Sequence, residues 1–155
     1  MSQSEAAAQT TQFECVTPIV PVANLQASIE YYVNVLGFRI DWHGGPMASV
    51  SRGGCHIMLC EGEQGHPGTW VWIGVGDADL LFAEYRVKGA KIRRPPTNYS
   101  WAYELQVFDL DSNVLRLGSD TREGEPFGPW LDEKGVLWRQ SADGGWERAE
   151  PATSG

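Results

Sequence analysis

The sequence is poor in the features that mark several large classes of protein. Only three of its 155 residues are cysteine, and Cys15, Cys55 and Cys60 form no CxxC pair. This spacing argues against a disulfide framework or a four-cysteine zinc site and favours free thiols in a reducing cytoplasm. No uninterrupted apolar run approaches the roughly 18 residues of a membrane span. Residues 1–12 also lack the basic and apolar segments of a secretory signal, so we expect a cytoplasmic protein without a membrane partner.

The sequence also has fewer basic residues than acidic ones. The chain has 12 Lys and Arg against 20 Asp and Glu, a formal net charge of −8. This sign argues against nucleic acid as a partner and allows cationic ligands. The sequence contains no P-loop, no G-x-S-x-G elbow and no complete G-x-G-x-x-G fingerprint, so no nucleotide cofactor is indicated.

The chain does contain an internal repeat. Each copy begins with a run rich in valine or isoleucine, the first at residues 16–22, which predicts a strand. Asn24 or Asp77 follows, a residue type that caps helices, and then an amphipathic stretch. The stretches close at Gly37 and Gly89, which lie 52 residues apart where a helix C-terminus favours glycine.

We interpret the two copies as βαβββ modules at residues 13–63 and 68–119, which gives an α+β fold class. One four-stranded module cannot cover its own sheet face, so the two must pair, within the chain or between two chains. Residues 1–12 are expected to be disordered. Residues 120–155 form an aromatic C-terminal extension in which we predict a hairpin at 136–148, packed on the body or on a partner.

Several motifs resemble the glyoxalase/bleomycin-resistance/dioxygenase superfamily, also called vicinal oxygen chelate. They are Val22-Ala23-Asn24-Leu25 before the first helix, Leu36-Gly37-Phe38 after it, and Asp109-x-Asp111-x-Asn113 before the last strand. Within the superfamily the likeness is to the bleomycin-resistance proteins. It rests on Pro18, on Thr69-Trp70-Val71-Trp72, on Phe82-Ala83-Glu84-Tyr85, and on Trp101 three residues before Glu104.

The resemblance also implies where a metal would lie. Enzymes of the superfamily bind a divalent ion through four residues, normally His, Glu or Gln, and the corresponding positions here are Thr17, Cys60, Trp70 and Arg116. Threonine is a poor ligand, tryptophan is none, and arginine repels the ion, so no metal and no catalytic residue is expected. An alternative is a cluster of His43, His56 and Glu61.

What the resemblance implies instead is a drug-binding groove in a homodimer. Aromatic rings would stack on a flat ligand, and the carboxylates of Asp41, Glu61 and Glu104 could face a cation. The predicted ligand-binding residues are Phe38, Asp41, Trp42, Cys60, Trp70, Trp72, Trp101 and Glu104.

Three functions compete on this basis. The first is a non-catalytic antibiotic-resistance protein that sequesters a bleomycin-like antibiotic or another aromatic cation. The second is a metal-dependent glyoxalase or dioxygenase with unconventional ligands. The third is an interaction module whose groove is plugged and whose contact surface is residues 126–146.

Overall fold

The computed structural model describes residues 10–149, so most of residues 1–12, which we expect to be disordered, lies outside this range. The first copy of the repeat, module 1, contains β1 (Ile19–Pro21), α2 (Leu25–Asn34), β2 (Arg39–Gly44), β3 (Met47–Arg52) and β4 (Cys55–Cys60). Its four-stranded sheet has the order β1-β4-β3-β2, with β1 parallel to β4 and the other neighbours antiparallel.

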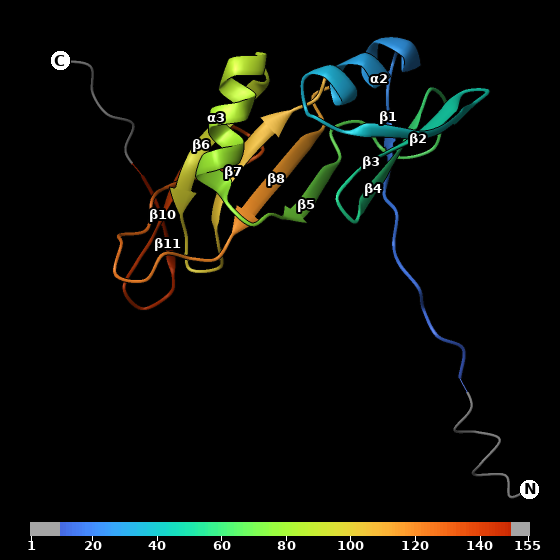
Figure 1. Ribbon diagram of the computed structural model, residues 1–155. Coiled ribbons are helices and arrows are strands. Elements are labelled where there is room, and N and C mark those ends of the chain that lie inside the picture. The colour runs from blue at the N-terminus through green and yellow to red at the C-terminus, as the bar shows by residue number, and fades with distance from the viewer. Residues whose placement is uncertain (1–9, 150–155) are drawn as a thin grey trace, which may run out of the picture.

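Module 2 repeats this arrangement. It contains β5 (Trp70–Gly74), α3 (Ala78–Lys88), β6 (Lys91–Asn98), β7 (Tyr103–Phe108) and β8 (Val114–Ser119), with the sheet order β5-β8-β7-β6. Figure 1 shows the two sheets side by side, each with its helix. The predicted α+β fold with two βαβββ modules is therefore confirmed.

One apolar core joins the two modules. Alternate strand residues such as Val50 and Leu59 in module 1 and Leu105 and Leu115 in module 2 are buried in the same cluster. We call the sheet surface that carries these residues the core face and the opposite surface the open face of each module. Polar contacts also cross between the modules, since Arg52 and Glu84 form a paired ion contact with N–O distances of 2.7 and 2.8 Å. The modules are thus fixed to one another within the chain.

The tyrosine hydroxyls of both helices add to this junction. Tyr32 of α2 donates to the Asp109 carboxylate at 3.0 Å, and Tyr85 of α3 donates to the Leu36 carbonyl at 2.8 Å. Burial raises the pKa of Tyr85 to about 12, which keeps its hydroxyl protonated as a donor.

The C-terminal extension forms a third, small sheet. It consists of β9 (Trp130–Leu131), β10 (Leu137–Gln140) and β11 (Trp146–Arg148), in the order β11-β10-β9. The predicted hairpin corresponds to β10 and β11, whereas β9 is an addition that the sequence did not indicate. Figure 1 places this C-terminal sheet against module 2, at the end of the molecule remote from module 1.

The first strand is shorter than the sequence predicts. We expected a strand over residues 16–22, but the strand that pairs with β4 spans only Ile19–Pro21, with one further backbone hydrogen bond to β4 at Pro18 and one at Val22. Residues 10–18, ahead of it, have no assigned secondary structure, and the side chains of Phe13 and Val16 are each 91% exposed. Valine content favours an extended backbone, but a strand also requires a neighbour with which to exchange hydrogen bonds.

The side chain of Asn24 caps α2. Its Oδ1 accepts a hydrogen bond from the Ala27 amide at 3.0 Å, which satisfies a donor that the first turn leaves free. We expect Asn24→Ala to lower the free energy of unfolding by about 1 kcal/mol in urea denaturation. The exposed neighbour Gln26→Ala is the control and should stay within about 0.5 kcal/mol of the wild type. Equal stability of the two variants would show that the cap contributes nothing.

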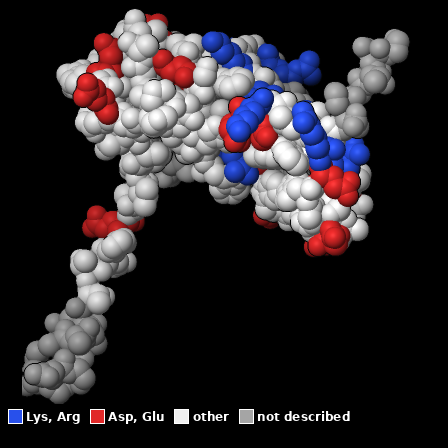
Figure 2. Space-filling model, turned by 180° about the vertical axis from the view of Figure 1, so that it is seen from behind, with Lys and Arg blue, Asp and Glu red and all other residues white. Residues whose placement is uncertain are grey.

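No helix within residues 10–149 has the length and apolar character that crossing a membrane requires. On the face shown in Figure 2, acidic patches and a broad uncharged area cover the module 1 end. Basic and acidic side chains lie next to one another at the module 2 end. The face shown therefore carries no large basic field of the kind that binds nucleic acid.

Candidate ligand-binding site: a tryptophan pocket on module 2

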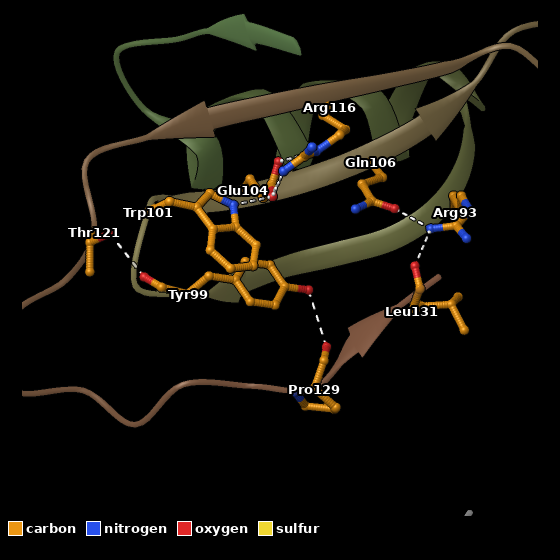
Figure 3. A network of polar contacts seen from close by, with 9 residues as sticks. All are labelled: Arg93, Tyr99, Trp101, Glu104, Gln106, Arg116, Thr121, Pro129 and Leu131. Carbon is orange, nitrogen blue, oxygen red and sulfur yellow. Dashed lines mark hydrogen bonds and ion pairs between the residues drawn. The ribbon is translucent and has the colours of Figure 1, made fainter. Parts of the chain in front are cut away.

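The open face of module 2 carries a buried ion pair. Glu104 of β7 has no exposed surface, and it accepts hydrogen bonds from Arg116 of β8 at 2.9 and 3.2 Å. The same carboxylate accepts the indole N–H of Trp101 at 2.8 Å (Figure 3). Because Arg116 satisfies the charge of Glu104, this carboxylate is not free to meet a cationic ligand.

Next to this pair lies a pocket of about 510 Å³, which we call the tryptophan pocket. Its lining consists of Trp101, Arg116, Trp130, Asp132, Trp138 and Trp146. Two of these residues come from module 2, and the other four come from the C-terminal extension. The volume falls in the range of small-molecule sites, and a predominantly aromatic lining is typical of them.

The rings of the pocket are held in defined orientations. Trp101 stacks on Tyr99 with ring centroids 4.7 Å apart and planes 3° from parallel. Trp130 meets Trp101 edge to face at 5.7 Å, and the Arg116 guanidinium lies 4.8 Å from the centre of the Trp130 ring. At the mouth, Trp146 lies 6.0 Å from Trp101, and these two rings are 42% and 41% exposed. The pocket is therefore preformed and open to solvent.

Asp132 follows β9 and organises the turn that leads into β10. Its Oδ1 accepts the amides of Lys134 and Val136 at 2.9 and 2.8 Å, and its Oδ2 accepts the Trp138 indole N–H at 2.8 Å. These bonds, the one from Trp138 first, lower the pKa of the Asp132 carboxyl. The carboxylate is therefore ionised at neutral pH, and it fixes the Trp138 ring against the pocket.

Two arginines of β6 attach the C-terminal sheet to module 2. Arg93 donates to the carbonyl of Leu131, at 3.0 Å, and to the side chain of Gln106 (Figure 3). It also donates to the carbonyl of Asp132. Burial lowers the pKa of the Arg93 guanidinium, which lies 4.7 Å from the centre of the Trp70 ring. Arg94 donates to the carbonyl of Pro129 at 3.0 Å.

The segment before β9 lies equally close to β6. A Cβ on Gly128 would collide with the Thr97 side chain, so glycine permits this approach. The Gly128 amide donates to the Asn98 carbonyl at 2.8 Å, and the Tyr99 hydroxyl donates to the Pro129 carbonyl at 3.1 Å. The extension is thus an ordered part of the site over residues 120–149.

The structure brings some of the predicted site residues together on module 2. Trp101 lines the tryptophan pocket, Glu104 lies beneath it, and Trp70 contacts Trp130 with ring centroids 6.1 Å apart. Trp72 lies apart, with its ring over Gly118, where an added Cβ would stand 3.0 Å from the indole. It is 51% exposed and lines a separate groove with the segment before β1.

The other predicted residues lie in module 1, away from the tryptophan pocket. Phe38 packs on Tyr32 in the core and is 5% exposed, and Cys60 is 2% exposed. Asp41 accepts hydrogen bonds from Ser51 and Ser49 at 2.7 and 3.0 Å. Trp42 is half-exposed on the edge strand β2. None of these four residues lines the tryptophan pocket that residues 10–149 form. Their assignment to the ligand site stays a prediction.

Two of the four positions at which the resemblance implies metal ligands, Trp70 and Arg116, do not fit a metal ion here. Arg116 is bound to Glu104, the Trp70 ring is covered by Arg93, and neither side chain offers a lone pair to an ion. The alternative cluster of His43, His56 and Glu61 does not form, because residues 10–149 contain no group of three or more His, Cys, Asp or Glu side chains placed to share an ion. Glu61 instead accepts the Leu25 amide at 2.7 Å.

Sequence reasoning missed the role of Asp132 and the convergence of three tryptophans from the extension on Trp101. A signal was present, since Asp132-Glu133-Lys134-Gly135 has the composition of a turn and stands between two aromatic segments. Nothing in the sequence, however, says that this turn lies over β7 and β8.

Comparison with known proteins agrees with this architecture. The sequence profile of the Glyoxalase/Bleomycin resistance protein/Dioxygenase superfamily matches residues 12–117. Among curated protein sequences none matches the chain. Trp130, Asp132, Trp138 and Trp146 lie beyond the matched range, so most of the tryptophan pocket is an addition to the shared domain.

Three solved structures illustrate the shared fold. One is a bleomycin-binding protein from Streptomyces verticillus complexed with copper(II)-bleomycin, with 22% identity, a TM-score of 0.63 and coverage of 71% of this chain and 98% of that one. Another is TnmS3, an antibiotic-binding protein from Streptomyces sp. CB03234, with 21% identity, a TM-score of 0.64 and coverage of 73% and 100%.

The third is a bleomycin resistance determinant encoded on the transposon Tn5, with 18% identity, a TM-score of 0.62 and coverage of 70% and 98%. Identities this low establish the common fold and leave the ligand of this chain to be tested. With the family profile matched across both modules, the chain belongs to the Glyoxalase/Bleomycin resistance protein/Dioxygenase superfamily.

Proposed function

We propose that this protein binds a bulky aromatic, cationic small molecule of the bleomycin type and releases it chemically unchanged. The tryptophan pocket, an opening of about 510 Å³ walled by four indoles, is the observation that carries the proposal. Bound antibiotic is kept from its target, which amounts to resistance by sequestration. The solved relatives that bind bleomycin or another antibiotic support the same class of ligand.

The chemistry of the pocket suits binding rather than turnover. Its polar groups are one ion-paired arginine and one carboxylate that accepts three hydrogen bonds. Stacking on a ring contributes on the order of 0.5–1.5 kcal/mol for each aromatic pair, and burial of apolar ligand surface adds to this. Because the rings are already oriented, little ordering is needed when a ligand enters.

The C-terminal extension covers part of the open face of module 2 and leaves the tryptophan pocket open. This supports a binding protein over an interaction module whose groove is plugged. Trp101 and Trp146 stay two-fifths exposed at the mouth, as a binding site requires and a packed interface does not.

We further propose a cytoplasmic homodimer. Cys15, Cys55 and Cys60 are all free thiols, which suits a reducing compartment. We propose that in this dimer Asp41 and Trp42 of module 1 line the same groove as Trp101, as in the groove that the resemblance to bleomycin-resistance proteins implies. Phe38, Cys60, Trp70 and Trp72 would support its walls.

Titration with metal-free bleomycin, followed by tryptophan fluorescence, tests the proposed function. We expect saturable quenching, and Trp101→Ala should weaken the affinity by about tenfold because a stacking face is lost. Phe127→Ala is the control, since Phe127 is a half-exposed aromatic that does not line the pocket. Mass spectrometry should recover the antibiotic unchanged. Unaltered affinity of Trp101→Ala, or a modified antibiotic, would contradict the proposal.

A further inference from the structure

Two charged side chains line the tryptophan pocket, and within residues 10–149 only one of them forms an ion pair. Arg116 is held by both oxygens of the buried Glu104, so its positive charge is balanced beneath the pocket. The Asp132 carboxylate is held only by neutral donors, two backbone amides and one indole. Arg93 donates to the backbone oxygen of Asp132 and does not line the pocket; its charge attracts the Asp132 carboxylate, but no ion-pair contact joins the two side chains. Beside four indoles, the lining therefore carries the Arg116 guanidinium, which Glu104 balances, and the Asp132 carboxylate, which forms no ion pair with any Lys or Arg of residues 10–149.

Aromatic rings arranged in this way attract cations. The face of an indole is electron-rich, and tryptophan binds organic cations more strongly than the other aromatic residues do. The protein already uses this property, because the Arg116 guanidinium lies over the Trp130 ring and the Arg93 guanidinium over Trp70. Trp101 and Trp138 direct their N–H groups to Glu104 and Asp132, and these bonds fix both rings at the pocket.

We infer that the tryptophan pocket is a cage for a substituted ammonium group, with Asp132 as its counter-charge. The inference rests on the proposed function and deepens it by assigning the cationic end of the ligand to the C-terminal extension. Glu104, which the sequence suggested for this role, is already neutralised by Arg116. A trimethylammonium group has no N–H to donate, so rings and a nearby carboxylate recognise it better than hydrogen-bond acceptors do.

Choline and its uncharged isostere 3,3-dimethylbutan-1-ol test the inference on the full-length protein. The two molecules share shape and hydroxyl and differ in charge. In isothermal titration we expect choline to bind about tenfold more tightly than the alcohol. Asp132→Asn should reduce this ratio of affinities about threefold or more, because the charge attraction is lost. Asn has one acceptor oxygen where Asp132 has two, so near-ultraviolet circular dichroism checks that the Trp138 ring keeps its place. The matched control is Glu133→Gln, an exposed neighbouring carboxylate outside the pocket, which should leave the ratio unchanged.

The outcomes separate this inference from the proposed function. Equal binding of choline and the alcohol by the wild type would overturn the ammonium cage even if Asp132→Asn folds poorly. An unchanged ratio in a folded Asp132→Asn variant would overturn the role of Asp132. Bleomycin binding without choline binding would overturn the cage and leave the proposed function standing. If neither molecule binds, both fail.

Discussion

Replacing Glu104 by alanine is expected to lower the free energy of unfolding by about 3 kcal/mol, because it leaves the largely buried Arg116 without its partner beneath the tryptophan pocket. The Glu104 side chain is fully buried and that of Arg116 is 25% exposed, so the loss should lie at the lower end for a broken buried pair. The indole of Trp101 loses its acceptor in the same variant. Urea denaturation followed by near-ultraviolet circular dichroism measures the change.

The control for this variant is Glu125→Ala. Glu125 lies 3.9 Å from Arg122, and the two side chains are 52% and 40% exposed, so this pair is screened by solvent. Glu125→Ala should lower the free energy of unfolding by no more than about 0.5 kcal/mol. If Glu104→Ala were as stable as this control, the ion pair under the tryptophan pocket would have no structural role.

Arg93→Ala should release the C-terminal sheet from module 2. The guanidinium binds the carbonyls of Leu131 and Asp132 and covers Trp70, so alanine removes every one of these contacts. Hydrogen bonds from a charged group contribute about 1.5–3 kcal/mol each. If the free energy that docks this sheet on module 2 falls by about 3 kcal/mol, the form in which the sheet is detached becomes roughly a hundredfold more populated.

Limited proteolysis measures that opening. We expect rapid cleavage between residues 120 and 149 in Arg93→Ala, survival of the two modules, and at least about tenfold weaker bleomycin binding, since the extension supplies three of the pocket's tryptophans. Arg139→Ala on the exposed side of β10 is the control. Equal cleavage rates in the two variants would show that Arg93 does not hold the sheet.

The repeat explains how much of the fold could be predicted from the sequence. Asn24 and Asp77 both cap helices, and Gly37 and Gly89 both adopt positive φ, at 79° and 77°. These are local signals, because caps and left-handed glycines depend on a few neighbouring residues. Strand β9 lacked such a signal, since it has two residues and exists only because β10 pairs with it.

The site shows where sequence reasoning reaches its limit. The sequence shows Trp101 three residues before Glu104. It does not show that the Glu104 carboxylate turns toward Arg116. That pairing depends on the register of β7 and β8, in which Gln106 lies opposite Arg116 and Glu104 opposite Gly118. The pocket depends in turn on where residues 120–149 dock, which no short-range pattern encodes.

The most direct test of the account is the nuclear magnetic resonance of the tryptophan side chains. The chain has seven tryptophans, whose indole N–H signals can be assigned by single Trp→Phe variants. On addition of bleomycin we predict the largest shifts for Trp101, Trp130, Trp138 and Trp146, the four that line the pocket. Shifts confined to Trp42 and Trp72, or no shift at saturating antibiotic, would contradict the claim that the tryptophan pocket is the ligand site.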